Sequence, residues 1–296
     1  MADTPRTPRL LGLLEEKFPP KLYGKKAWFR PQPPIPADVV KAAVVPRWSD
    51  WVYDGAALDD TVTVDVNAAW VAAASCVSWA FEALEHSGPL PVFPGWPGYY
   101  RVMVAGDEWQ DRRIVHPLGR DDLHGAVWLA QPTAALLVEL HRKWDLWPQL
   151  MIVDSWTCSR SVKPKEWVAH VKAERERLID SRDHEQYARF KDSYRATITG
   201  LPGPKPGDDW NCLSRRPDWR DATMAMDAAN TWRKAWKCVE AGFGPVRMGR
   251  TDELTFGHED LLTLASLPSS PLRLDQTGKS LGTFKVKSRD TAGAGS

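Results

Sequence analysis

The sequence predicts a mixed α/β (α+β) fold, and two kinds of segment support this prediction. Residues 61–66 (TVTVDV) alternate in polarity and are β-branched, which is typical of a strand. Residues 164–181 and 184–199 are long, polar and free of internal Pro, which predicts two consecutive helices joined by a short turn. Because 43% of the 296 residues are apolar, the chain can bury a substantial core.

The other expected elements place an antiparallel meander and a β-hairpin around these segments. Turn residues, N-capping side chains and changes in periodicity give their bounds. In chain order we expect a helix at 67–85, strands at 99–105, 114–116 and 126–130, a helix from its N-cap Thr133 to 144, a strand at 150–155, a helix at 219–241, a hairpin at 244–256, a helix at 258–266 and a strand at 282–287.

The two ends of the chain have a different composition. Residues 1–46 are punctuated by Pro and predict an extended arm, and residues 289–296 predict a disordered Gly/Ala/Ser tail. The N-terminus lacks the apolar centre of a signal peptide, and the chain contains no run of eighteen apolar residues. We therefore expect a cytoplasmic protein with no membrane partner.

Several common kinds of site lack their markers. The four cysteines form no CxxC pair and the seven histidines show no HxxxH or HxH spacing, which argues against a zinc site. No GxxxxGK[ST] loop or Gly-x-Ser-x-Gly turn is present, so NTPase and serine hydrolase functions are disfavoured.

The distribution of charge points instead to a phosphate-bearing ligand. The net charge is only +1, but residues 186–250 carry twelve Lys and Arg against seven Asp and Glu. A local basic surface can bind nucleic acid because counterion release depends on the charges in contact. An ordinary charged helix face would give the same composition, and most of the sixteen Trp residues are expected in the core.

Two aspartates stand at positions suited to metal chemistry. Asp65 lies near the end of the first strand, and Asp252 lies at the tip of the expected hairpin. Phosphoryl transfer by two metal ions needs carboxylates brought together on rigid elements, with the metals about 4 Å apart. Asp65 and Asp252 are therefore the candidate catalytic and metal-binding pair.

The order of these motifs resembles a B-family DNA polymerase. Asp65-Val66-Asn67-Ala68-Ala69-Trp70 is similar to motif A of that family, and Arg250-Thr251-Asp252 matches the second and third residues of the Asp-Thr-Asp of motif C. Arg250 thus replaces the first carboxylate of that motif. The resemblance spans residues 60–256 and implies a palm-like antiparallel sheet with a helical fingers hairpin.

The same resemblance implies domains and ligand contacts. The palm would comprise residues 47–162 and 211–288, with the fingers at 163–210. Lys191 matches the lysine that holds the triphosphate, assisted by Arg195 or Lys172, and Trp70 matches the aromatic residue under the incoming sugar. Two Mg²⁺ ions would be the cofactor.

A second resemblance is to telomere-associated proteins of actinobacterial linear replicons. It rests on Asp154-Ser155-Trp156-Thr157, on residues 191–198 (KDSYRATI) and on Arg216-Pro217-Asp218-Trp219-Arg220. Such proteins act with a terminal protein at replicon ends. This resemblance implies DNA, as a primer-template or a single-stranded end, and a terminal protein as partners.

Three arginines in the last third of the chain have two possible uses. Arg216, Arg220 and Arg233 could bind DNA phosphates as planar, bidentate donors. They could equally pair within the protein with Asp218, Asp221 and Asp227. Three hypotheses remain open: a nucleotidyltransferase, a non-catalytic DNA-end binding factor, and an unrelated α/β protein whose motifs match by chance.

Overall fold

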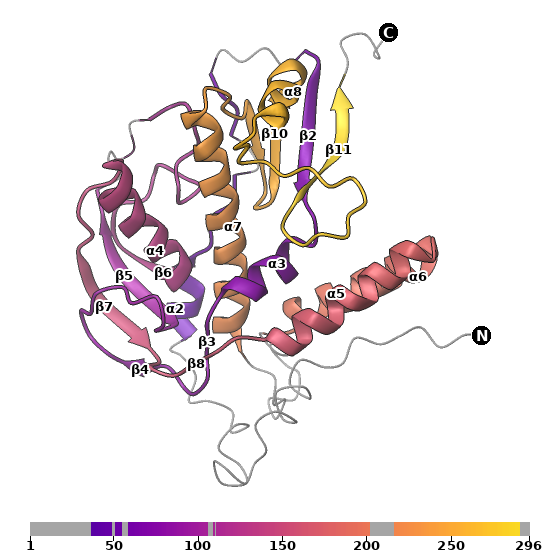
Figure 1. Cartoon of the computed structure of the whole chain (residues 1–296). Helices are drawn as coiled ribbons and strands as arrows, with labels where there is room; N and C mark the ends of the chain where they lie inside the picture. Colours follow the sequence, from indigo (N-terminus) through magenta and orange to yellow (C-terminus); the bar gives the residue numbers. More distant parts are fainter. Residues whose placement is uncertain are drawn as a thin grey trace, which may run out of the picture.

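The computed structural model describes residues 37–48, 51–54, 59–105, 109, 111–201 and 216–290. The long helix α7 (Pro217–Glu240) runs through the middle of the molecule between two sheets, and a pair of helices projects from one side (Figure 1). This arrangement confirms the α+β fold class and the fingers-like hairpin.

The larger sheet has five strands in the order β1-β6-β5-β7-β4. β1 is parallel to β6, and the other pairs are antiparallel. The strands are β1 (Ala43–Val44), β4 (Glu85–His86), β5 (Gly98–Val104), β6 (Gly125–Ala130) and β7 (Ile152–Thr157), with helix α4 (Gln131–Glu139) and the π-helical turn η2 (Leu140–Trp144) following β6.

The smaller sheet has four antiparallel strands in the order β11-β2-β10-β9. Its elements are β2 (Thr61–Val66), β9 (Arg247–Gly249), β10 (Glu253–Gly257), β11 (Phe284–Asp290) and the adjoining helix α8 (His258–Ser266). Alternation along β2 sends Val62 and Val64 into the core and leaves Asp65 half-buried on the opposite face. The candidate aspartate therefore lies on the face of the sheet that the core does not cover.

The fingers-like hairpin consists of α5 (Lys165–Asp180) and α6 (His184–Thr199). Asp183 caps α6 by accepting a hydrogen bond from the Gln186 amide at 2.9 Å. The hairpin is joined to the body through helix α3 (Ala69–Cys76) and a two-stranded ladder of β3 (Trp79–Ala80) and β8 (Ser161–Val162).

Stacked tryptophans anchor the base of this hairpin. Trp219 of α7 stacks on Trp79 with ring centroids 4.9 Å apart, and its Nε1 donates to the Ala80 carbonyl at 2.8 Å. Trp219 is 1% exposed. The hairpin is therefore held to the central helix by a buried aromatic cluster, as expected for a chain whose tryptophans are mostly in the core.

Trp219→Ala is expected to lower the free energy of unfolding by about 3–5 kcal/mol, because it opens a large cavity in a packed cluster. Urea unfolding followed by far-UV circular dichroism measures this change. Phe93→Ala, at a residue that is 41% exposed, is the matched aromatic control and should cost less than about 1 kcal/mol. Equal losses in the two variants would contradict the anchoring role.

Several expected bounds were wrong. The helix expected at 67–85 ends at Cys76, because Trp79 and Ala80 pair with β8. Residues 114–116 form no strand and are buried coil. Thr133 does not cap α4, which begins at Gln131 with Pro132 in its first turn, a position where Pro is favoured.

The expected ends also need correction. Residues 37–46 of the expected extended arm include helix α2 (Ala37–Ala42) and strand β1, which joins the five-stranded sheet by pairing with β6. β11 runs to Asp290, two residues into the expected tail. The rest of the expected arm (1–36), the loop after the fingers (202–215) and the rest of the expected tail (291–296) lie outside the described residues.

Candidate active site

The two sequence-predicted aspartates meet at one end of the four-stranded sheet. β10 pairs with β2 so that Glu253 lies opposite Asp65, and residues 250–252 form the three-residue tip between β9 and β10. The Val66 amide donates to the Asp252 carbonyl at 3.1 Å, and the side chains of Asp252 and Asp65 line the same cavity. Strand pairing thus brings together two carboxyl groups that are 187 residues apart in the sequence.

The proximity of these carboxyls changes their electrostatics. Burial, followed by the negative charges of Asp65 and Glu253, raises the pKa of Asp252 to about 7, while Lys287 acts in the opposite direction. Two carboxylates that share a confined site cannot both ionise without cost, so Asp252 keeps its proton to a higher pH than a free carboxyl group does. A bound divalent cation would remove that cost.

This raised pKa predicts a pH dependence of stability. The folded state holds a proton on Asp252 that the unfolded chain releases, so in the absence of metal the melting temperature should fall as pH rises from about 4 to about 7. Asp252→Asn should weaken this fall. Thermal unfolding of the wild type and the variant across that pH range, in EDTA, measures the difference. An equal fall of the melting temperature in both proteins would contradict the raised pKa of Asp252.

A third carboxylate lies behind the pair. Asp227 of α7 is 3% exposed and accepts a hydrogen bond from the Thr251 hydroxyl at 3.0 Å. Burial, followed by the charges of Asp252 and Asp65, raises the pKa of Asp227 well above its usual value. From the sequence, Asp227 was expected only as a possible partner of an arginine. The signal that could have identified it is an acidic residue inside the largely apolar segment ATMAMDAA of a helix.

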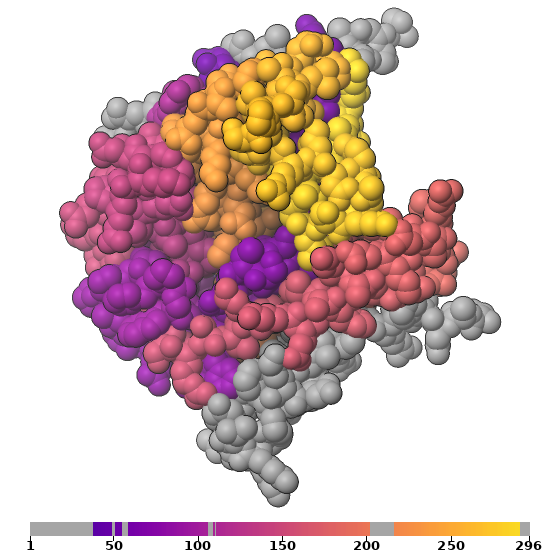
Figure 2. Space-filling model, in the orientation of Figure 1, coloured from indigo at the N-terminus to yellow at the C-terminus, as the bar shows by residue number. Residues whose placement is uncertain are grey.

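A basic cleft faces the aspartates. A cavity of about 280 Å³ lies between the end of the four-stranded sheet and the α5–α6 hairpin, and Figure 2 shows the hairpin diverging from the C-terminal strand β11. The acidic residues Asp65, Asp252 and Glu253 line it. The cations that line it are Arg175, Lys191, Arg195, Arg250, Lys285 and Lys287.

Three of the four residues predicted to bind nucleotide line this cleft. Lys191 and Arg195 belong to α6, and Trp70 belongs to α3. The Arg195 guanidinium lies over the Trp70 ring, with its Cζ atom 5.8 Å from the ring centroid. Lys172 is not among the residues that line the cleft: it is half-exposed and pairs with Glu176 at 3.8 Å. It lies on the solvent side of α5, whereas Arg175, one helical turn later, faces inward.

Arg175 is a site residue that the sequence analysis missed. Its side chain is 1% exposed, and its Nη2 donates to the Tyr187 hydroxyl at 3.1 Å and to the Gly278 carbonyl at 2.8 Å. Its Nε and Nη1 have no hydrogen-bond partner among the described residues. A buried guanidinium with unpaired donors and no ion pair among the described residues is costly.

The three arginines predicted to bind DNA make contacts within the protein instead. Arg216 is 9% exposed and forms a bidentate pair with Asp218 at 3.0 and 2.7 Å. Arg220 pairs with Asp221 at 3.4 Å, and Arg233 pairs with Glu139 of α4 at 2.6 Å. The expected pairs with Asp218 and Asp221 are therefore present, whereas Arg233 pairs with Glu139 and not with Asp227. None of the three arginines lines the cleft.

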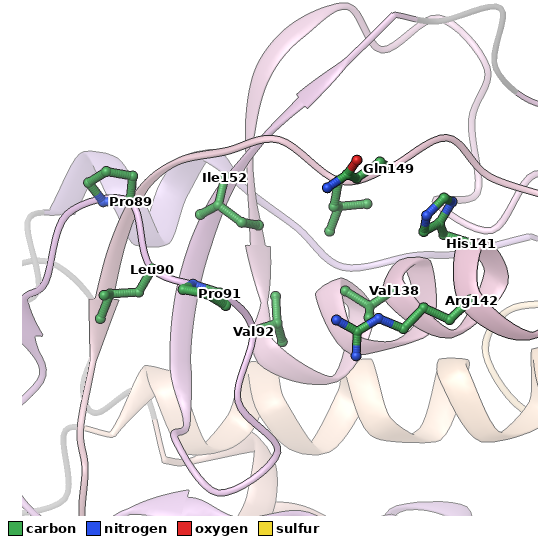
Figure 3. A pocket seen from close by; sticks show the side chains of 10 residues that line it. Pro89, Leu90, Pro91, Val92, Val138, His141, Arg142, Gln149 and Ile152 are labelled. Atoms are coloured by element: carbon green, nitrogen blue, oxygen red, sulfur yellow. The ribbon is translucent and has the colours of Figure 1, made fainter.

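A second cavity, of about 420 Å³, lies beside α4 and η2. Leu90, Val92, Val138 and Ile152 give it an apolar wall, and His141 and Arg142 lie along one edge (Figure 3). None of the described residues that line this cavity is acidic. It therefore lacks the carboxylate chemistry of the Asp65–Asp252 cleft.

The fold of the chain is similar to the polymerase domain fold of a known DNA polymerase. Structures of phi29 DNA polymerase, a B-family enzyme, are similar to the chain. The complex with primer-template DNA (post-translocation binary complex) aligns with a TM-score of 0.57 and 10% identity over 90% of this chain and 49% of that one. The orthorhombic crystal form of the same polymerase aligns with a TM-score of 0.58 and 10% identity over 95% of this chain and 52% of that one.

A third phi29 structure, the ternary complex with primer-template DNA and incoming nucleotide substrates, gives a TM-score of 0.57 and 11% identity over 93% of this chain and 51% of that one. The chain thus spans about half the length of these polymerases. No family model and no curated protein sequence matches it. At this identity the similarity shows the fold, and the function has to be argued from the cleft.

Proposed function

We propose that this protein binds DNA in the cleft and transfers nucleotides to a primer end in a Mg²⁺-dependent reaction. The observation that carries the proposal is that Asp65 and Asp252 lie at the same end of the four-stranded sheet and line one basic cleft. Paired carboxylates on rigid strand ends facing phosphate-binding cations are what phosphoryl transfer requires. The polymerase-like fold supports the same reaction class.

The donor set fits Mg²⁺. Magnesium prefers oxygen ligands and is commonly held by one or two carboxylates that substrate phosphates complete. Asp65 and Asp252 supply two such carboxylates. Among the described residues, no cluster of three or more His, Cys, Asp or Glu side chains could hold a metal ion. Bound Mg²⁺ would lower the pKa of the attacking primer hydroxyl and neutralise charge on the phosphates.

The cations of the cleft would orient the substrates. Lys191 and Arg195 on α6, together with Arg175 on α5, would hold the triphosphate of the incoming nucleotide. Trp70 offers an apolar ring to the sugar or base. Lys285 forms no ion pair among the described residues and faces the same cleft, so it is available to the phosphates of the primer or template.

A second function remains a candidate because of Arg250. This residue lines the cleft beside Asp252, in place of a motif C carboxylate, and makes no ion pair with Asp65. A cation at that position would favour binding of a DNA end over metal chemistry. The protein would then be a non-catalytic, telomere-associated factor that recruits a terminal protein.

No helix in the described part of the chain is long and apolar enough to cross a membrane.

Primer extension on a labelled hairpin DNA with Mg²⁺ or Mn²⁺ tests the proposal. Metal-dependent extension by the wild-type protein supports nucleotidyl transfer. Binding of the same DNA, measured by fluorescence anisotropy at several salt concentrations, separates the two functions, because phosphate contacts make affinity fall steeply with salt. Salt-sensitive binding without extension would support the DNA-end factor and overturn the catalytic proposal.

A further inference from the structure

We propose that Asp227 is a positioning residue that fixes the Asp252 carboxyl group by holding Thr251. The inference rests on the proposed function, because it concerns the same pair of carboxylates. It goes beyond that function by assigning a role to a buried acid on the central helix α7, which supplies no lining residue to the cleft.

The contact between the helix and the hairpin tip is buried and specific. Asp227 is 3% exposed and Thr251 is 7% exposed. The Thr251 hydroxyl donates to Asp227 Oδ2 at 3.0 Å. A buried hydrogen bond to a carboxyl group has a strong geometric preference, because any movement of either side chain leaves a polar atom unpaired in the interior.

The tip that carries Asp252 needs such a restraint. Arg250 has a φ of 43°, in the left-handed region that residues other than Gly rarely adopt. Backbone bonds hold the two ends of the tip: the Trp48 amide donates to the Arg250 carbonyl at 2.9 Å, and the Val66 amide donates to the Asp252 carbonyl at 3.1 Å. Thr251 between them is held by its side chain, so the Asp227 contact completes the restraint.

The same helix supports the neighbouring strand end. Lys234 lies seven residues after Asp227, about two turns along the same face of α7, and its Nζ donates to the Gly282 carbonyl at 2.6 Å. The Gly282 amide in turn donates at 3.0 Å to the carbonyl of Asn67, two residues after Asp65. α7 therefore restrains both segments that carry the catalytic carboxyls, and Asp227 does so for Asp252.

A double-mutant cycle on metal affinity tests this role. The variants are Asp227→Ala, Thr251→Val and the double variant, and the readout is the dissociation constant for Mn²⁺, from electron paramagnetic resonance of the free ion. We expect each single variant to bind Mn²⁺ about 10–100-fold more weakly, as is typical when a partner of a metal ligand is removed. The double variant should be no weaker than either single variant, because both remove one contact.

Conservative variants separate positioning from charge. Asp227→Asn and Thr251→Ser keep the acceptor and the hydroxyl, so both should bind Mn²⁺ within about threefold of the wild type. If Asp227→Asn were as weak as Asp227→Ala, the charge would act directly on the metal, and the positioning role would be overturned. Should Asp227→Ala fail to fold, the comparison of Thr251→Val with Thr251→Ser decides.

Thr223→Val is the matched control for a buried polar change in the same helix. The Thr223 hydroxyl donates to the Trp219 carbonyl at 2.8 Å and accepts from Trp79 Nε1 at 3.1 Å, so its contacts involve neither Asp227 nor Thr251. It should lower the melting temperature without changing Mn²⁺ affinity. The proposal would be overturned if Asp227→Ala bound Mn²⁺ as tightly as the wild type. It would also be overturned if the loss of Mn²⁺ affinity in the double variant equalled the product of the losses in the two single variants.

The outcomes also distinguish this proposal from the proposed function. Mn²⁺ binding with the expected pattern but no primer extension would retain the positioning role and reject the polymerase activity. Extension that Asp227→Ala and Thr251→Val leave unchanged, with unchanged Mn²⁺ affinity, would reject the positioning role alone. A wild-type protein that binds no Mn²⁺ would reject both.

Discussion

Asp252→Asn is expected to reduce primer extension by at least about a thousandfold. The variant keeps the volume of the side chain but removes one of the two carboxylates that meet at the edge of the cleft. Loss of metal-dependent charge stabilisation is worth several kcal/mol, which corresponds to about three orders of magnitude in rate. Single-turnover extension of the labelled hairpin DNA measures this loss.

Asp65→Asn should have a similar effect, because the two carboxyls act as a unit. Glu259→Gln, at an exposed acid on α8 outside the cleft, is the matched control and should leave extension unchanged. Neither aspartate variant should bind DNA more weakly, because each removes negative charge from the site. Extension that persists in either aspartate variant would show that the pair does not perform the chemistry.

Arg175→Met and Lys191→Ala should each raise the KM for the incoming nucleotide by about 10–100-fold. A charge-assisted hydrogen bond to a phosphate contributes about 1.5–3 kcal/mol, which gives this range. Arg175 is the stronger test because its Nε and Nη1 lack partners among the described residues. Steady-state extension at varied nucleotide concentration, in parallel with thermal unfolding, separates binding from folding.

Lys172→Ala is the control for that experiment. Lys172 is on the same helix as Arg175 but pairs with Glu176 at the surface, so its removal should leave the KM unchanged. A KM that rises in Lys172→Ala and stays constant in Arg175→Met would restore the sequence-based assignment. It would also show that the buried guanidinium is a structural group.

The elements that the sequence predicted well are those whose evidence is local. β2 coincides with its alternating β-branched run, α6 and α8 match their expected bounds, and the tip carrying Asp252 lies between two strands as expected. Alternation, helix caps and turn residues are properties of neighbouring positions, so one sequence is enough to detect them.

The elements that were predicted poorly depend on partners far away in the chain. The strand β1 pairs with β6, more than eighty residues later, and nothing in Ala43–Val44 identifies that partner. Similarly, Trp79 and Ala80 were expected to extend the helix α3 but form the strand β3, because they pair with β8. Two-residue strands carry no periodicity, so only the completed sheet could reveal them.

The candidate site divides in the same way. By itself the sequence determined the fold class, the fingers-like helices, and Asp65 and Asp252 as candidates, because motifs and strand ends are visible in the order of residues. Only the tertiary structure decided that Arg175 rather than Lys172 faces the cleft, that Arg216 pairs with Asp218, and that Asp227 holds Thr251. These choices depend on burial and on contacts across the fold, as between Arg175 and Gly278, and a buried charge acquires its role from the groups that folding brings around it.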